Sequence, residues 1–243
     1  MHGLGDEAYI RQRIEPLPGD PLYLHLVDLL EGLKTLIPHN ITRVLDYGCG
    51  GSPYRRLFGP CAYHRADLAG DETLDFEYGA DSRLPVELSD YDCVFSSQVL
   101  EHVLSPSSYL AECYRVLKPG GYLLLTTHGL FEDHACPDDY WRWTAFGLRR
   151  VVEEAGFKVD RALKLTTGPR AAMFLAEREL TRLRFKGLGL YSYMLKSGAR
   201  VLRFTNARRR HEACDASFSQ HRISDADQVG HDMYIAIALA ARR

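Results

Sequence analysis

Residues 44–54 read VLDYGCGGSPY, and this stretch joins an apolar strand to a turn of small residues. The run from Ile41 to Leu45 is rich in β-branched and aliphatic side chains, which predicts a strand buried on both faces. Glycine has no Cβ, so the backbone N–H groups of Gly48 and Gly50 can approach a ligand closely. The stretch therefore predicts a nucleotide-binding turn, and a plain chain connection is the alternative.

The residues after the turn disfavour two common kinds of nucleotide site. A nicotinamide fingerprint needs a third glycine three residues after the second, and Pro53 holds that place. A P-loop needs Gly-Lys-Ser/Thr, which is absent. Asp67 follows an apolar-leaning segment and lies roughly twenty residues past the turn, where a carboxylate can accept hydrogen bonds from both ribose hydroxyls. We therefore expect a nucleoside ligand without a pyrophosphate.

From about Arg43 to Thr127 the chain resembles the class I S-adenosylmethionine-dependent methyltransferases of the type 11-like group. The resemblance is carried, in this order, by VLDYGCGG at 44–51, Asp67, GADSRLP at 79–85, YDCVFSSQVLEHV at 91–103 and LKPGGYLLLTT at 117–127. One departure is Ser52, which stands where many members have a third glycine. The resemblance implies S-adenosylmethionine as cofactor, with S-adenosylhomocysteine as product.

The resemblance also implies roles for the cofactor-site residues. Asp46 is expected to orient the amino group of the cofactor, although an acid at a strand end can equally hold the turn together. Asp81 is expected to accept from the adenine amino group, with the Ser82 backbone nearby. Ser97 and Gln98 end the fourth expected strand, beside the first. The expected cofactor-binding residues are Asp46, Gly48, Gly50, Asp67, Leu68, Asp81, Ser82, Ser97 and Gln98.

The loop at 128–144 follows the fifth expected strand and faces the acceptor side of the same crevice. A hydroxyl acceptor needs proton removal, for which histidine is suited; His128 is the first candidate base and His134 the second. The DYWRWT run at 139–144 resembles the DYWRFT-like segment of a bacterial methyltransferase subgroup. That resemblance implies an acceptor site of Asp139, Tyr140, Trp141 and Arg142, while a core role for the tryptophans is the alternative.

The histidines of this region also raise the question of a metal ion. His128, His134, Cys136 and Asp138 have only loose loop spacing, so no metal site is expected from them. His102 follows Glu101 after the fourth strand, and in the resembled family this pair more often fastens the local structure than acts as a base.

The fold class expected is α/β, with a Rossmann-like, doubly wound seven-stranded sheet that is mostly parallel and has an antiparallel last strand. Residues 1–38 are expected to form a loosely ordered arm and a covering helix capped by Asp20. Residues 39–168 and 233–243 form the methyltransferase core, and 169–232 form a basic, mainly helical insertion between the last two strands.

The insertion has an unusual charge. Residues 170–210 hold eleven Lys or Arg against two acids, a net charge of +9, whereas the whole chain has a formal net charge of -2. This block is interpreted as a solvated surface, as a lid for a phosphorylated or carrier-linked acceptor, or as a contact with anionic lipid. No nucleic-acid partner is expected, since no known binding module is recognised.

The composition, with 46% hydrophobic residues, is that of an ordinary globular domain. No run of apolar residues is long enough for a membrane span, no signal peptide is visible, and the six cysteines form no CxxC pair, so a cytoplasmic location is expected. The sequence predicts an enzyme that methylates a small molecule by in-line displacement, at a hydroxyl of a sugar, a lipid-linked glycan or a secondary metabolite. The alternative is an inactive cofactor-binding scaffold that acts through the basic insertion.

Overall fold

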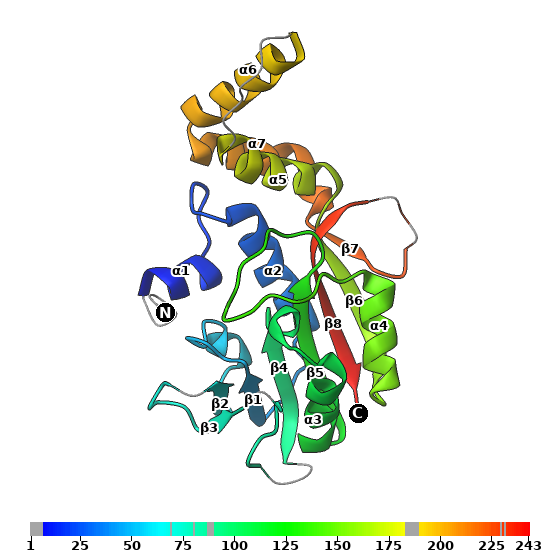
Figure 1. Cartoon of the computed structure of the whole chain (residues 1–243). Helices are drawn as coiled ribbons and strands as arrows, with labels where there is room; N and C mark the ends of the chain where they lie inside the picture. Colours follow the sequence, from blue (N-terminus) through cyan, green and yellow to red (C-terminus); the bar gives the residue numbers. More distant parts are fainter. Residues whose placement is uncertain are drawn as a thin grey trace.

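A single sheet organises the protein. The computed structural model describes residues 7–68, 70–79, 81–86, 90–182, 190–228, 230 and 232–243. Its strands are β1 (Arg43–Tyr47), β2 (Ala62–Leu68), β3 (Phe76–Tyr78), β4 (Tyr91–Ser97), β5 (Leu117–His128), β6 (Lys158–Thr167), β7 (Ile223–Asp225) and β8 (Tyr234–Arg242). They lie in the order β3-β2-β1-β4-β5-β8-β6-β7 (Figure 1). The pairs from β3 to β5 are parallel, and β8 is antiparallel to both of its neighbours.

This order confirms the expected Rossmann-like, mostly parallel sheet with an antiparallel last strand. The expected count of seven strands is corrected to eight among the described residues. The extra strand is β7, which lies in the insertion and pairs with β6 at the sheet edge. This strand could not be recognised from the sequence, because a segment of three residues is too short to show a period-2 pattern.

Helices cover both faces of the sheet (Figure 1). They are α1 (Glu7–Ile14), α2 (Tyr23–Leu36), α3 (Pro106–Val116), α4 (Ala145–Glu154), α5 (Gly168–Arg182), α6 (Leu190–Phe204) and α7 (Ala207–Phe218), with 3₁₀ turns η1 (Arg55–Phe58), η2 (Leu100–His102) and η3 (Ser219–His221). Along β1, Val44 packs under α2 on one face and Leu45 under α3 on the other. This alternation explains why the adjacent residues Val44 and Leu45 are both apolar.

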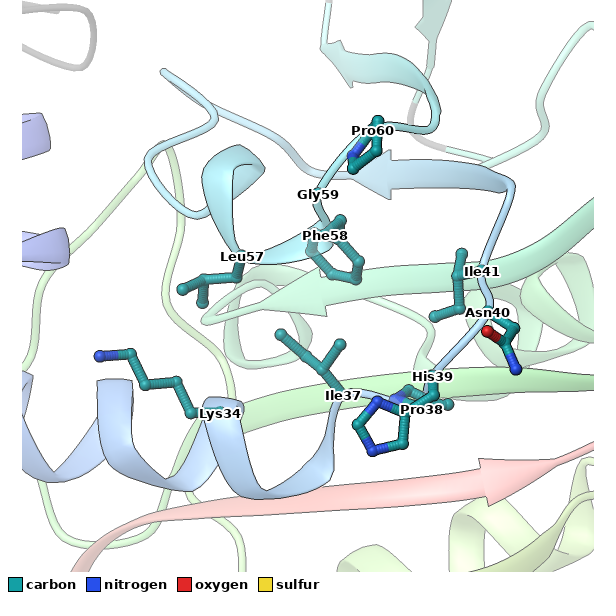
Figure 2. Close-up of a pocket in the computed structure, with 10 residues that line it drawn as sticks. All are labelled: Lys34, Ile37, Pro38, His39, Asn40, Ile41, Leu57, Phe58, Gly59 and Pro60. Carbon is teal, nitrogen blue, oxygen red and sulfur yellow. The ribbon is translucent and has the colours of Figure 1, made fainter.

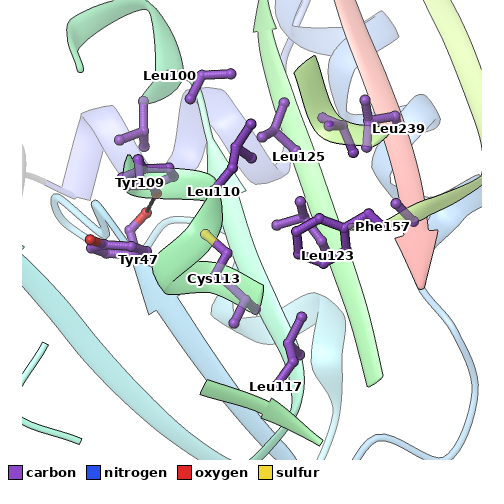
Figure 3. Close-up of a cluster of buried hydrophobic side chains, with 14 of the residues drawn as sticks. Tyr47, Leu100, Tyr109, Leu110, Cys113, Leu117, Leu123, Leu125, Phe157 and Leu239 are labelled. Carbon is purple, nitrogen blue, oxygen red and sulfur yellow. Dashed lines mark hydrogen bonds between the residues drawn. The ribbon is translucent and has the colours of Figure 1, made fainter. Parts of the chain in front are cut away.

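The core under α3 also holds the turn after β1 in place. Tyr109 of α3 stacks on Tyr47, with ring centroids 4.2 Å apart, and its hydroxyl donates to the Tyr47 carbonyl at 2.9 Å (Figure 3). Figure 3 shows the leucines of β5 and α3 filling the space beside this pair. The last residue of β1 is therefore fixed by packing before the chain turns.

The N-terminal region differs from the expectation of a loose arm. Residues 7–14 form α1, and α2 begins at Tyr23, without a side-chain cap. Asp20 does not cap α2 because its carboxylate pairs with Arg11 at 2.6 Å and accepts from the Leu17 N–H at 2.8 Å. The carboxylate instead links α1 to the turn before α2. By contrast, α4 has a side-chain cap: the Thr144 hydroxyl accepts from Gly147 N–H at 3.1 Å.

The segment between β6 and β8 holds α5, α6 and α7, which lie together at one end of the molecule (Figure 1). Several of its bases pair with acids within the chain: Arg170 with Asp28 and Asp215, Arg178 with Glu132, Arg208 with Glu212, and Arg210 with Glu177. Arg184 and Lys186 lie outside the described residues. Among the helices described, none has the length and hydrophobicity that a bilayer crossing requires.

Candidate functional site

The glycine turn lies at the carboxyl end of β1, where the neighbouring strands β2 and β4 also end. Gly48 has φ +78°, and a Cβ there would lie 2.6 Å from the Val99 side chain, so any other residue would be strained and would displace Val99. The N–H of Gly50 donates to Asp67 Oδ2 at 2.6 Å, while Asp67 Oδ1 accepts from the Leu68 N–H at 2.7 Å. Five of the expected cofactor-binding residues therefore lie together where β1 and β2 end: Asp46, Gly48, Gly50, Asp67 and Leu68.

Arg65 of β2 is a part of this site that the sequence did not reveal. Its guanidinium donates to the Gly50 carbonyl at 2.8 Å and to the Ser52 hydroxyl at 3.0 Å, and it pairs with Asp71 at 3.0 Å. A single basic residue within a strand belongs to no sequence motif, so this role could not be predicted. The structure shows that Arg65 links the glycine turn to the loop after β2.

Asp46 is buried at the end of β1 and accepts a hydrogen bond from the Tyr63 hydroxyl at 2.7 Å. Burial raises the pKa of Asp46 to about 7, although hydrogen bonds from Tyr63 and Ser52 oppose the shift. Because its pKa lies near neutral pH, the Asp46 carboxyl can gain or lose a proton when a ligand binds beside it.

Two further groups come from the loop after β3 and the end of β4. Ser82 is buried, and its carbonyl accepts from the Tyr47 hydroxyl; its exposed neighbour Asp81 accepts from Arg83 N–H at 3.2 Å. The backbone and side-chain N–H groups of Gln98 donate to Thr126. The Gln98 Oε1 atom is buried without a hydrogen-bond donor among the described residues.

Helix α1 lies near the glycine turn, which the expectation of a loose arm missed. Burial raises the pKa of Tyr9, the charge of Arg13 opposes the shift, and the carboxylates of Asp46 and Asp67 make smaller contributions that raise it. The Arg13 guanidinium lies 3.4 Å from the centre of the Tyr9 ring. The side chains of α1 therefore act on the same charged groups as the turn.

A second polar cluster lies past the ends of β4 and β5. Glu101 of η2 is fully buried, and its Oε2 accepts from the Thr127 hydroxyl at 2.7 Å. Its Oε1 lies 3.3 Å from Nε2 of His128. Burial raises the pKa of Glu101 to about 7. Burial also lowers the pKa of His128 well below its ordinary value, with a further contribution from His25.

Four histidine rings gather around this carboxyl. The His128 ring stacks on Phe131 with centroids 4.0 Å apart and meets the His134 ring edge-on at 4.9 Å. His134 in turn meets His102 at 4.8 Å, and His25 of α2 lies 5.5 Å from His128. Both candidate bases of the sequence analysis therefore lie in one cluster, together with His102, which was given a structural role, and with His25 of α2.

The loop after β5 is fastened by its own side chains. Arg142 binds both carboxylate oxygens of Asp139 at 2.6 Å and donates to the carbonyls of Phe131 and Glu132. These contacts lie within the loop, so the Arg142 guanidinium stabilises the conformation of the loop. Tyr140 and Trp141 are 45% and 40% exposed, and only these two of the four expected acceptor residues present large surfaces to solvent.

A hollow of about 490 Å³ lies at the opposite end of β1 (Figure 2). The linker before β1 and the segment between η1 and β2 line it, with Lys34 and Ile37 at the end of α2. It contains none of the expected site residues. The site of interest is therefore the carboxyl edge of the sheet, as expected for an open α/β sheet.

Comparison with known proteins supports this reading. Residues 45–125 match the methyltransferase domain family. The ubiquinone biosynthesis O-methyltransferase of Roseobacter denitrificans is 32% identical over 108 residues, 37% of this chain and 42% of that protein. A Mycolicibacterium smegmatis protein named "Probable S-adenosylmethionine-dependent methyltransferase" is 24% identical over 216 residues, 82% of this chain and 76% of that protein.

The fold is also shared with solved structures. The S-adenosylmethionine dependent methyltransferase from Mesorhizobium loti has a TM-score of 0.52 at 15% identity, covering 89% of this chain and 98% of that one. The chain spans less than half the length of the first ubiquinone-biosynthesis relatives that it matches. The residues similar to the methyltransferase domain family contain the glycine turn and run into β5, so they are the part of the chain that forms the carboxyl edge of the sheet.

Proposed function

We propose that this protein is an enzyme that transfers the methyl group of S-adenosylmethionine to an oxygen atom of a small-molecule acceptor. The observation that carries the proposal is the hydrogen bond from Gly50 N–H to Asp67, which brings the glycine turn and the carboxylate after β2 together at one crevice edge. The matched family uses this cofactor, and the O-methyltransferase named above supports oxygen as the acceptor atom.

The residues present fit this cofactor. It has hydroxyl and ammonium donors, and the crevice edge offers acceptors for them: the carboxylates of Asp67 and Asp46, and the buried Oε1 of Gln98, which has no donor among the described residues. A buried acceptor without a donor is unfavourable, so a ligand that supplies the donor is stabilised there. When bound, the cofactor supplies an activated methyl group on a sulfonium. The role of the protein is then chiefly to hold acceptor and cofactor in line.

The acceptor side of the crevice is the cluster around Glu101 and His128. A neutral acceptor hydroxyl must lose its proton, and the unprotonated imidazole of His128 can take it. His128 is only 3% exposed, so the acceptor reaches it when Phe131 or His134 moves aside. Tyr140 and Trp141 are the exposed surfaces on which the acceptor packs. Acceptors of this class are sugars, lipid-linked glycans and secondary metabolites.

The insertion at 169–232 is proposed to be a helical cover rather than an interaction module. Arg170, Arg178 and Arg210 pair with acids within the chain, so their charge serves internal structure more than an anionic ligand or lipid. This pairing also weakens the alternative of a scaffold that acts through the basic block. All six cysteines are free, which supports the expected cytoplasmic location.

Calorimetric titration of the purified chain with S-adenosylmethionine, S-adenosylhomocysteine and NAD tests the cofactor. We expect both sulfur nucleosides to bind and NAD not to bind; binding of NAD alone would refute the proposal. Incubation with methyl-labelled cofactor and pools of hydroxylated metabolites then identifies the acceptor. With that acceptor, His128→Ala is expected to lower turnover by about 10²–10⁴-fold at nearly unchanged cofactor affinity, and wild-type turnover would exclude His128 as the base.

A further inference from the structure

We propose that Glu101, His102 and His134 bind a divalent transition-metal ion of the Zn²⁺ type. One ligand atom from each of these side chains lies within 4.8 Å of the other two. Zn–N and Zn–O distances of about 2.0–2.2 Å place tetrahedral ligands about 3.4 Å apart. The three side chains therefore need to close by only about 1 to 1.5 Å. Since His134 lies on a loop and is half-buried, it can make this movement.

Hydrogen bonds fix which nitrogen of each histidine is available. His102 Nδ1 lies 2.6 Å from the carbonyl oxygen of Asp138, and His134 Nδ1 lies 3.2 Å from that of Glu132. A carbonyl can only accept, so Nδ1 carries the hydrogen in both rings. Nε2 is then left with a lone pair. Metal-binding histidines almost always donate their other N–H to a carbonyl or carboxylate in this way.

Asp139 extends this pattern. Its Oδ2 accepts from the His134 backbone N–H at 2.9 Å and lies 3.4 Å from Nδ1 of the same residue. Arg142 neutralises this carboxylate from the other side through two contacts of 2.6 Å. The charge of Arg142 is thus offset by Asp139, which lessens its repulsion of a bound cation.

Glu101 supplies the negative ligand. Thr127 occupies its Oε2, whereas Oε1 is fully buried and has no hydrogen-bond donor among the described residues. His128 Nε2, 3.3 Å away, does not meet hydrogen-bond geometry with this oxygen. An uncompensated carboxylate oxygen in the interior is costly, and a bound cation removes that cost. This orphan oxygen is an observation independent of the histidine geometry.

The ligand set indicates the class of metal. Two imidazoles and one carboxylate suit Zn²⁺, Fe²⁺ or Co²⁺, while Mg²⁺ prefers oxygen ligands alone. Three protein ligands leave at least one position open, which is the arrangement of catalytic rather than structural zinc sites. On the proposed function above, the acceptor hydroxyl would bind at that open position, and the metal ion would lower the pKa of the hydroxyl. The metal site itself does not depend on that function.

The test uses the full chain after removal of metal with a chelator and dialysis. Titration with Zn²⁺ by calorimetry, and with Co²⁺ by visible absorption, is expected to give one site per chain, with Mg²⁺ giving none at the same concentrations. His134→Ala and His102→Ala are expected to weaken Zn²⁺ binding by at least about 100-fold. The matched control is His39→Ala, because His39 is exposed at the opposite end of β1 and should leave binding unchanged.

Titration with S-adenosylmethionine separates failure of this inference from failure of the proposed function. His134 lies outside the expected cofactor residues, so His134→Ala should retain cofactor affinity and a wild-type circular dichroism spectrum while it loses Zn²⁺. Glu101→Gln, which keeps the shape of the buried side chain, should also lose Zn²⁺. Absence of Zn²⁺ and Co²⁺ binding in the wild type, or equal binding by the wild type and both histidine variants, overturns the metal site whatever the cofactor result.

Discussion

The side chains of Arg170 and Asp28 form a fully buried ion pair, with Nε of the arginine 2.6 Å from Oδ2 of the aspartate. Arg170 belongs to α5 and Asp28 to α2, so the pair joins the segment after β6 to the helix that covers the sheet. Asp215 of α7 binds the same guanidinium at 2.7 Å. The three helices are thus connected through one buried cation.

Arg170→Ala should therefore be strongly destabilising, because it removes the guanidinium 2.6 Å from the buried carboxylate of Asp28 and leaves only Arg222 near it, at 3.9 Å. We expect a loss of about 3–5 kcal/mol in the free energy of unfolding, measured by urea denaturation. Arg150→Ala is the control, since Arg150 forms an exposed pair with Glu154 and should cost no more than about 0.5 kcal/mol. Similar losses in the two variants would contradict the role given to burial.

Asp67→Ala tests the cofactor site. Removal of the carboxylate eliminates the acceptor of the Gly50 N–H and, on the proposed function, the acceptor of the ribose hydroxyls. Since a hydrogen bond to a charged group contributes about 1.5–3 kcal/mol, affinity for S-adenosylhomocysteine should fall by about 10- to 150-fold in calorimetry. Glu72→Ala, an exposed acid in the following loop, is the control and should bind as the wild type does. Unchanged affinity in Asp67→Ala would place the ribose elsewhere.

Cofactor binding should also depend on pH through Asp46. Its pKa of about 7 means that the carboxyl gains a proton as the pH falls, and only the ionised form attracts the cofactor ammonium strongly. Between pH 7.5 and 6 the ionised fraction falls about eightfold, so affinity should fall by up to that factor. Asp46→Asn should bind weakly at both values. Methylthioadenosine, which lacks the amino-acid tail, should show no such dependence; an equal dependence would exclude Asp46 as its source.

His25 should make the protein less stable in acid. Burial lowers its pKa to about 3, whereas the unfolded chain takes up this proton near pH 6.5. The unfolded state therefore binds more protons between these values, and stability falls as the pH drops through 6.5. From pH 7 to pH 5 this single group should cost about 2 kcal/mol.

His25→Phe tests that contribution, since a phenyl ring can pack beside Phe131 and Phe174; the variant also removes the smaller effect of His25 on the pKa of His128. Urea unfolding at pH 7 and pH 5 should show a smaller acid loss in the variant, by about 2 kcal/mol. His39→Ala should keep the loss of the wild type. Parallel pH curves for the wild type and His25→Phe would show that His25 titrates normally in the folded protein.

Local pattern was enough to predict the sheet and the turn at its centre. Adjacent apolar residues such as Val44 and Leu45 point to opposite faces of a strand, which predicts a sheet covered on both faces, and a side chain at Gly48 would be strained by its φ of +78° and would meet Val99. The cap at Thr144 was predictable for the same reason, because its hydrogen bond reaches only three residues along the chain. Helix α1 and strand β7 were missed because they are short and partly polar, so contacts with distant segments stabilise them.

Long-range packing settled the features that no local pattern contains. The chain places Glu101 and His102 after β4 and His134 after β5, and these two strands are neighbours only in the folded sheet. The loose spacing of His128, His134, Cys136 and Asp138 along the chain predicted no metal site. In the fold, one ligand atom each of Glu101, His102 and His134 lies within 4.8 Å of the other two. In the same way the charge of residues 170–210 could be counted from the chain. The acids that pair with these bases could not be read from the chain, because they lie on other segments. In the folded protein, Arg170 of α5 pairs with Asp28 of α2 and Asp215 of α7, and Arg178 pairs with Glu132 in the loop after β5.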